Sequence, residues 1–135
     1  MAKADKQYTS FSIDQNWYVM PLELTSFFSR YENILPLPGL PSIVLGLAYQ
    51  NGQLITVLSG EKLLSLKSKN DSKLYLVFKK EDELFALSVD EGGQSISSQQ
   101  VFKDNKAKVF KNYIKYNKNK FYILEPAKIF EQLAL

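Results

Sequence analysis

The run VLGLAYQNGQLITVL, from Val44 to Leu58, carries the strongest local structural signal in the sequence. Two apolar segments rich in strand-forming residues flank Asn51-Gly52, a pair that tolerates the positive φ angles of a tight turn. We therefore predict a β-hairpin over this stretch. Gly46 and Gly52 are expected to serve its backbone geometry, because glycine adopts conformations that other residues avoid.

Outside this stretch, three more pairs of apolar, alternating segments have the pattern of β-hairpins. Each pair is separated by a short polar stretch of the kind that forms turns. A further structural turn is expected at Asp90, after the strand that ends at Val89. The predicted pairs are Tyr8–Ile13 with Trp17–Leu22, Lys73–Phe78 with Glu83–Val89, and Tyr113–Tyr116 with Phe121–Leu124.

Short helices are expected after Leu58 and after Leu124. Ser59 is a candidate N-cap for the first helix, and it precedes a short apolar face. Pro126 occupies a position that is favoured in the first turn of the second helix. The polar stretch Lys67–Lys73 breaks the pattern and predicts a linker or loop.

The order of these segments repeats along the chain. Val57 aligns with Ile123 at one spacing, and Tyr18 aligns with Phe85 at a spacing one residue longer. We therefore expect one mainly β domain over residues 1–135, built from two related β-barrel lobes at about 7–68 and 69–135. Such small lobes bury too little surface to be stable singly, so they should share an interface, and strands can exchange between them.

The segment Thr25–Ile43 is expected to be an extended apolar loop, because its closely spaced prolines exclude a helix or a central strand. Two interpretations of its apolar residues remain open. Ile34, Leu37 and Leu40 could cover the mouth of a barrel. Alternatively, part of the loop could be a protein-docking surface, as exposed apolar patches often are.

Composition excludes most catalytic chemistry. The 135 residues include no cysteine and no histidine, which removes thiol nucleophiles, the commonest general base and the commonest metal ligands. The carboxylates around Asp90 lack such partners and do not have the spacing of a calcium loop. We expect no enzyme, no catalytic residue, no metal and no cofactor. No apolar run is long enough to span a membrane, so a cytoplasmic protein without direct membrane insertion is expected.

The charge is mildly basic and unevenly spread. The formal net charge is +3, and Arg30 is the only arginine among 17 basic residues. The stretch Lys103–Lys120 holds seven lysines and one acid, Asp104, with aromatic residues interleaved. It could be a solvated lysine face over core aromatics, a contact for an acidic protein, or a site for single-stranded nucleic acid. No nucleic-acid partner is expected, since arginine is preferred for phosphate recognition.

The ordered set of motifs resembles the CheW-like family, the coupling proteins of bacterial chemotaxis arrays. A tyrosine–apolar–proline run is followed by a proline-containing loop, a valine-x-glycine strand and an apolar strand that ends in valine-aspartate. The resemblance closes with a strand and a helix, and it covers nearly the whole chain. The matching segments are Trp17–Leu22, Leu35–Pro41, Val44–Gly52, Ala86–Asp90 and Phe121–Leu133. The resemblance implies two five-stranded SH3-like barrel lobes with a pseudo-twofold relation.

Two departures from the family pattern concern receptor binding. The usual asparagine-x-arginine-glycine turn is Tyr49-Gln50-Asn51-Gly52 here, and a glutamate of the family falls on Phe27. In the family that glutamate and that arginine lie near the receptor-binding groove, so this surface should be neutral and more apolar. We expect Phe27, Phe28, Tyr49 and Asn51 to make the receptor contact.

The resemblance implies a non-catalytic signalling scaffold that couples a chemotaxis-type histidine kinase to chemoreceptors. The expected partners are the regulatory domain of the kinase and the cytoplasmic tip of a receptor, with recruitment to membrane-associated receptor arrays. By the same resemblance, the kinase domain should pair with the protein barrel to barrel. One alternative is a divergent adaptor of another chemosensory pathway, such as pilus or surface motility. Another is a basic β-barrel that binds single-stranded nucleic acid.

Overall fold

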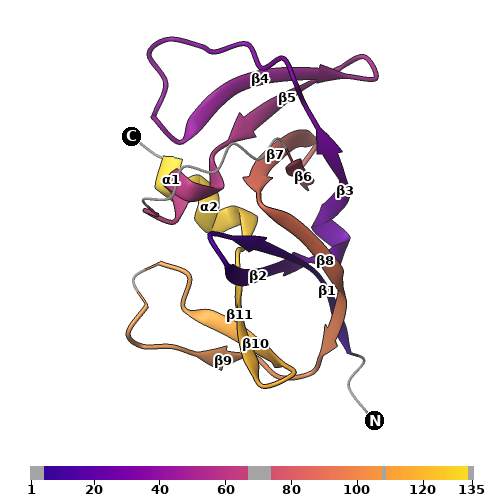
Figure 1. Cartoon of the computed structure of the whole chain (residues 1–135), viewed down its shortest axis with the longest axis vertical. Coiled ribbons are helices and arrows are strands. Elements are labelled where there is room, and N and C mark those ends of the chain that lie inside the picture. The colour runs from indigo at the N-terminus through magenta and orange to yellow at the C-terminus, as the bar shows by residue number, and fades with distance from the viewer. Residues whose placement is uncertain (1–4, 67–73, 108, 134–135) are drawn as a thin grey trace.

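The strands of the chain form two sheets, as Figure 1 shows for the computed structural model, which describes residues 5–66, 74–107 and 109–133. One sheet has six strands in the order β8-β1-β2-β11-β10-β9, and the other has five in the order β3-β6-β7-β5-β4. We call them, with their loops, the six-stranded and the five-stranded lobe. The strands are β1 Lys6–Ile13, β2 Asn16–Pro21, β3 Thr25–Arg30, β4 Val44–Gln50, β5 Gln53–Leu58, β6 Leu74–Lys80, β7 Glu83–Val89, β8 Glu91–Ser98, β9 Phe102–Lys103, β10 Asn112–Tyr116 and β11 Asn119–Ile123.

The four predicted hairpins are present: β4 with β5, β1 with β2, β6 with β7, and β10 with β11. Three of them turn at two consecutive residues of positive φ, the conformation of the tight turns that match strand twist. At Asn51 and Gly52 the φ angles are 51° and 79°. The other two turns lie at Asp14-Gln15 and Asn117-Lys118. The local sequence therefore specifies each of these strand pairs.

Both short helices are also present. Helix α1, Gly60–Leu63, follows β5, and the Ser59 side chain accepts a hydrogen bond from the Lys62 amide at 3.2 Å. This is the N-cap predicted for Ser59. Helix α2, Pro126–Leu133, follows β11, with Pro126 as its first residue. A single 3-10 turn, η1 Leu22–Leu24, joins β2 to β3. The linker predicted at Lys67–Lys73 lies outside the described residues.

The two halves of the chain exchange strands in a repeated way. Strand β5 runs parallel to β7, with Thr56 opposite Phe85. Strand β11 runs parallel to β2, with Tyr122 opposite Tyr18. The first half thus places β1 and β2 in the six-stranded sheet, and the second half places β6 and β7 in the five-stranded sheet, as the expected pseudo-twofold relation requires. The predicted fold class, mainly β with two related SH3-like lobes, is confirmed.

Three details of the prediction are wrong. The lobes are not closed five-stranded barrels, because β8 and β9 are the ends of one sheet and β3 and β4 the ends of the other. Thr25–Arg30 is a strand rather than part of the extended loop. The prolines of the predicted loop begin only at Pro36, so β3 can pair with β6. The stretch after Asp90 continues into β8, although its Gly92-Gly93 pair is typical of a turn; pairing with β1 overrides that local preference.

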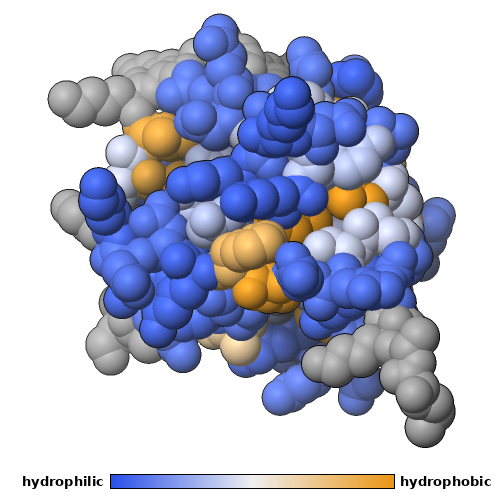
Figure 2. Space-filling model, turned by 90° about the horizontal axis from the view of Figure 1, so that it is seen from below, coloured by the Kyte–Doolittle hydropathy of each residue, from blue (hydrophilic) through white to orange (hydrophobic). Residues whose placement is uncertain are grey.

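The largest core cluster joins the two sheets and draws residues from both halves of the chain. It includes Phe11 and Met20 from one sheet and Leu58 and Leu87 from the other, all fully buried. A smaller cluster fills each lobe, around Val57 and Val77 in the five-stranded lobe and around Val19 and Ile114 in the six-stranded lobe. The shared cluster fixes the lobes against each other. Seen from the β9–β11 end, the surface is mostly hydrophilic, with apolar surface in separate small areas (Figure 2).

Candidate binding cleft between the lobes

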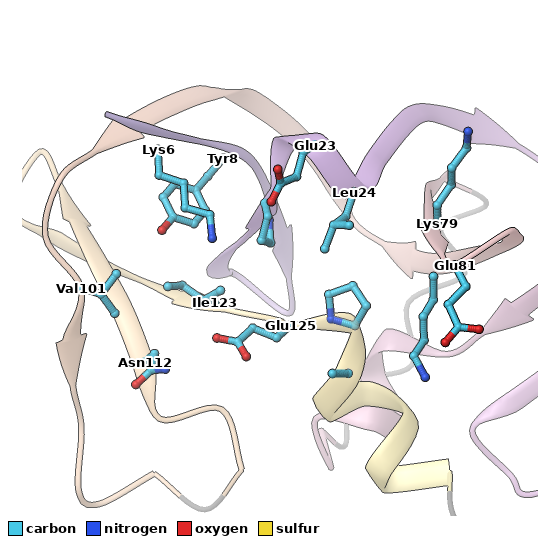
Figure 3. A pocket seen from close by; sticks show the side chains of 14 residues that line it. Lys6, Tyr8, Glu23, Leu24, Lys79, Glu81, Val101, Asn112, Ile123 and Glu125 are labelled. Carbon is cyan, nitrogen blue, oxygen red and sulfur yellow. The ribbon is translucent and has the colours of Figure 1, made fainter. Parts of the chain in front are cut away.

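A cleft of about 530 Å³ lies where the two lobes meet. Its walls come from β1, the end of β2, η1, the turn between β6 and β7, the loop after β8, and the junction of β11 with α2. Figure 3 shows Val101 at one end of the cleft and Lys79 and Glu81 at the other. The lining residues are Lys6, Tyr8, Pro21, Glu23, Leu24, Lys79, Lys80, Glu81, Val101, Asn112, Ile123, Glu125, Pro126 and Ala127.

The cleft combines apolar side chains with balanced charges. Leu24, Ile123 and Pro126 supply apolar surface, while three lysines and three glutamates stand around them. Because the charges cancel, the cleft has no strong preference for an anion or a cation. An apolar surface with a polar, charge-balanced surround is typical of protein-binding sites. A segment with one apolar and one mixed-charge face would fit it.

Tyr8 and Glu125 line the same cleft although they lie near opposite ends of the chain (Figure 3). Burial raises the pKa of the Tyr8 phenol, and the negative charge of Glu125 raises it further. The Lys6 ammonium lies 5.8 Å from the centre of the Tyr8 ring. Glu125 directly precedes the first residue of α2, a position where a carboxylate interacts favourably with the helix dipole.

The arrangement offers no catalytic constellation among the described residues. The cleft has a phenol and carboxylates but no activated nucleophile, and the chain contains neither histidine nor cysteine. Within residues 5–66, 74–107 and 109–133, no three acidic side chains gather as a metal site would need. Nor does any helix in these ranges have the length and apolar character needed to cross a bilayer. The chemistry of the cleft suits binding.

None of the four residues predicted to contact the receptor lines this cleft. Phe27 and Phe28 lie on β3, where Phe27 is 42% exposed. The Phe28 ring packs over Gly92 of β8, so closely that a Cβ on Gly92 would lie 3.1 Å from it. Phe28 thus marks a second contact between the lobes.

Tyr49 and Asn51 lie at the tip of the β4–β5 hairpin, and Tyr49 is 70% exposed. Between them, Gln50 accepts hydrogen bonds from the side chains of Ser29 and Tyr31, which lie at the end of β3. The hairpin tip therefore stands beside β3, and the structure brings the two predicted pairs to the same lobe. The prediction that they contact a receptor remains a prediction.

The three residues predicted to be structural have defined positions. At Gly46 the φ angle is 146°, and a Cβ there would lie 2.1 Å from the carbonyl oxygen of Leu35. Gly52 occupies the hairpin turn with open space around it. The Asp90 carboxylate accepts a hydrogen bond of 2.7 Å from the Asp14 amide, and so ties the β1–β2 turn to the end of β7.

A second apolar surface lies on the outer side of the β4–β5 hairpin. Tyr49 is directly opposite Leu54 in the ladder, and Leu54 is 64% exposed. Leu35, exposed to the same extent, pairs with Leu47 through two backbone hydrogen bonds of 2.8 and 2.9 Å. We call Leu35, Leu47, Tyr49 and Leu54 the hairpin face. Of the loop residues, Ile34 packs against the core of the lobe, whereas Leu37 and Leu40 are exposed.

The sequence did not reveal the cleft. Its residues come from six separate segments, and no local pattern connects Tyr8 with Glu125. The one available signal was Pro126, which predicts that a helix begins there and that Glu125 stands at its start. Only the parallel pairing of β11 with β2 brings that helix start next to η1 and β1.

A two-lobed, mainly β protein with an apolar, charge-balanced cleft between its lobes has the features of a binding domain. The family model for the CheW-like domain matches residues 7–134, and the chain belongs to this family of chemotaxis-signalling adaptors. Its structure is similar to that of the scaffolding protein TtCheW from Thermoanaerobacter tengcongensis, with a TM-score of 0.84 at 17% sequence identity. That likeness covers 94% of this chain and 93% of the other. No curated protein sequence matches the chain.

Proposed function

We propose that this protein is a non-catalytic adaptor that couples a chemotaxis-type histidine kinase to chemoreceptors. Membership of the CheW-like family supports the adaptor role. The single observation that carries the proposal is the cleft: both lobes build it, and it combines apolar side chains with balanced charges. The protein would act by holding partners in a fixed geometry. It contributes binding free energy to the complex and makes or breaks no covalent bond.

For the receptor, we propose that a helical segment of the cytoplasmic tip lies in the cleft. An amphipathic helix would place its apolar side against Leu24 and Ile123 and its charged side among the lysines and glutamates. Phe27 and Phe28 on the adjoining β3 could extend the contact, as the sequence predicts. In this arrangement the lobes need not move, because their shared core fixes the width of the cleft.

For the kinase, we propose that its regulatory domain packs on the hairpin face. The side chains of Leu35, Tyr49 and Leu54 are all largely exposed, and contiguous exposed apolar patches mark docking sites. The hairpin face and the cleft lie on different parts of the molecule, so both partners could bind at once. This simultaneous binding is what coupling requires.

Reconstitution with a kinase regulatory domain and a receptor cytoplasmic fragment from the same genome tests the proposal. We expect a ternary complex in analytical ultracentrifugation. Leu24→Glu should weaken receptor binding about tenfold or more and spare the kinase domain, because it places a charge on apolar contact surface. Leu54→Glu should do the reverse. Failure of both partners to bind would overturn the adaptor proposal.

Tyr49→Ala and Phe27→Ala separate the cleft from the residues that the sequence predicts. If they abolish receptor binding while Leu24→Glu does not, the receptor contact lies on β3 and the hairpin tip, and the cleft assignment is wrong. The same assay distinguishes pathways. Binding to a kinase of a pilus or surface-motility system, in place of a swimming chemotaxis kinase, would identify the alternative adaptor.

A further inference from the structure

The charge of the chain is concentrated in one segment. Residues 102–128 contain eight lysines and two acids, a net charge of +6, whereas the rest of the chain contains nine basic and twelve acidic residues, a net charge of −3. These two parts account for the overall charge of +3. The protein is therefore electrostatically polar, and its positive end is in the six-stranded lobe. Such an asymmetry steers charged partners during association.

Within this segment, two lysines are held side by side over aromatic rings. Lys115 and Lys120 are direct partners in the β10–β11 ladder, an unfavourable position for two like charges. The Lys115 ammonium lies 4.7 Å from the centre of the Phe102 ring, and that of Lys120 lies 4.9 Å from the centre of the Tyr113 ring. We call Phe102, Asp104, Tyr113, Lys115, Lys120 and Tyr122 the lysine face.

The acid of this face is already engaged. The Asp104 carboxylate accepts a hydrogen bond of 2.6 Å from the Tyr122 hydroxyl and one of 2.9 Å from the Lys106 amide. Lys115 and Lys120 make these cation–π contacts, and the charge of Lys120 also helps to lower the pKa of the Asp104 carboxyl. The rings hold the two ammonium groups in place on exposed side chains. Two ordered positive charges thus have one nearby carboxylate, which already accepts two hydrogen bonds, so the lysine face keeps a net positive charge.

Three observations indicate what kind of anion this face fits. The lysines cover the Phe102 and Tyr113 rings, and Tyr113 is only 9% exposed, so these two rings offer little open face for the base stacking that single-strand binders use. The segment contains no arginine for bidentate phosphate recognition. Its end of the molecule is mostly hydrophilic, with apolar surface only in separate small areas (Figure 2), which disfavours insertion into lipid. Of the anions considered, the carboxylates of an acidic protein segment fit this face best.

We infer that the lysine face binds an acidic segment of a partner protein. Glutamate or aspartate side chains would pair with the ammonium groups of Lys115 and Lys120 and so relieve the repulsion between them. The remaining lysines of the segment add long-range attraction. This site is separate from the cleft and the hairpin face, and it would add speed and charge selectivity to docking.

Fluorescence anisotropy with a labelled poly-L-glutamate of about 20 residues, in ~0.15 M salt where the screening length is about 8 Å, tests the inference. We expect saturable binding that weakens steeply as salt is raised. Lys115→Glu and Lys120→Glu should each weaken it about fivefold or more, and Lys115→Gln by less. The matched control is Lys62→Glu, an exposed lysine on α1, which should change binding less than about twofold. Circular dichroism checks that each variant folds.

Two parallel probes give the opposing outcomes. The first probe is a single-stranded oligothymidylate with the same charge as the poly-L-glutamate. If it binds more tightly, and Lys115→Glu weakens its binding to the same extent, the ligand of the lysine face is nucleic acid and not an acidic protein. The second probe is a vesicle of phosphatidylserine and phosphatidylcholine. If the protein binds it more tightly than poly-L-glutamate, the ligand is an anionic membrane and not an acidic protein. Equal losses in Lys62→Glu and Lys115→Glu, or no binding of poly-L-glutamate, would overturn the assignment of the lysine face.

Discussion

The Tyr31 hydroxyl donates a hydrogen bond to the side-chain oxygen of Gln50, and this contact joins the two edges of the five-stranded sheet. Tyr31 follows β3 and Gln50 ends β4, which are the first and last strands in the order of that sheet. Side chains thus connect edges that no backbone ladder closes. The bond also sets the hairpin tip, with Tyr49 and Asn51, beside β3.

We predict that Tyr31→Phe destabilises the protein by about 1 kcal/mol, because it removes a hydrogen bond to a half-buried acceptor while keeping the ring. Tyr31 is 8% exposed and packs against Tyr75, so its ring contacts should survive the change. Urea unfolding gives the free energy. The control is Tyr49→Phe at the exposed tip, with an expected change within about 0.5 kcal/mol. Equal effects of the two variants would contradict a closing role for Tyr31.

Gly46→Ala is predicted to cost about 3 kcal/mol or more, since its Cβ would collide with the Leu35 carbonyl oxygen at 2.1 Å and φ is 146°. Gly52→Ala meets nothing within 4 Å and should cost only the strain of its φ of 79°, about 1 kcal/mol. Thermal unfolding of the two variants checks the order. A smaller loss for Gly46→Ala than for Gly52→Ala would mean that the proline loop does not pack against β4.

The shared core predicts that the two lobes unfold together. Trp17, the only tryptophan, lies in the six-stranded lobe and reports on that lobe by fluorescence. Ile55→Ala removes buried volume in the other lobe, where Ile55 is 1% exposed, and should cost about 2–5 kcal/mol. We expect the Trp17 transition in urea to shift by the full amount. A Trp17 transition that stays at its original midpoint would show that the lobes unfold independently.

The Tyr122–Asp104 pair predicts a titration at high pH. The hydrogen bond to Asp104, followed by partial burial, raises the pKa of Tyr122 from 10.0 to about 12. Asp104→Asn should lower that pKa, and Tyr122→Phe should remove its step from the tyrosinate absorbance curve. Asp82→Asn in the β6–β7 turn is the control and should leave the curve unchanged.

The sign of the effect on stability follows from these shifts. Because the folded pKa of Tyr122 is raised, its contribution is fully present below pH 10.0 and is lost as the pH rises toward about 12. The same bond lowers the pKa of Asp104, so the contribution of that carboxylate is lost as the pH falls through its lowered pKa. If the free energy of unfolding of Asp104→Asn falls as steeply above pH 10.0 as that of the wild type, this account is wrong.

Much of the fold could be predicted, but little of the cleft. The hairpins around Asn51 and Asn117 depend on turn residues next to alternating strands, all within a few positions of one another. By contrast, β8 was missed, because its Gly92-Gly93 pair is typical of a turn and only pairing with β1 makes it a strand. Glu125 could be placed at the start of a helix, but its proximity to Tyr8 depends on how that helix docks.

What the amino-acid order determined by itself is local: the turns, the cap at Ser59, the two helix positions and the lack of histidine and cysteine chemistry. These features rest on backbone preferences and composition, which need no distant neighbour. The tertiary structure decided which strands exchange between the halves, where the sheets stay open, and that Tyr8 and Glu125 share one cleft. Such pairings depend on burying side chains from both ends of the chain in one core, and short-range sequence patterns do not encode that choice.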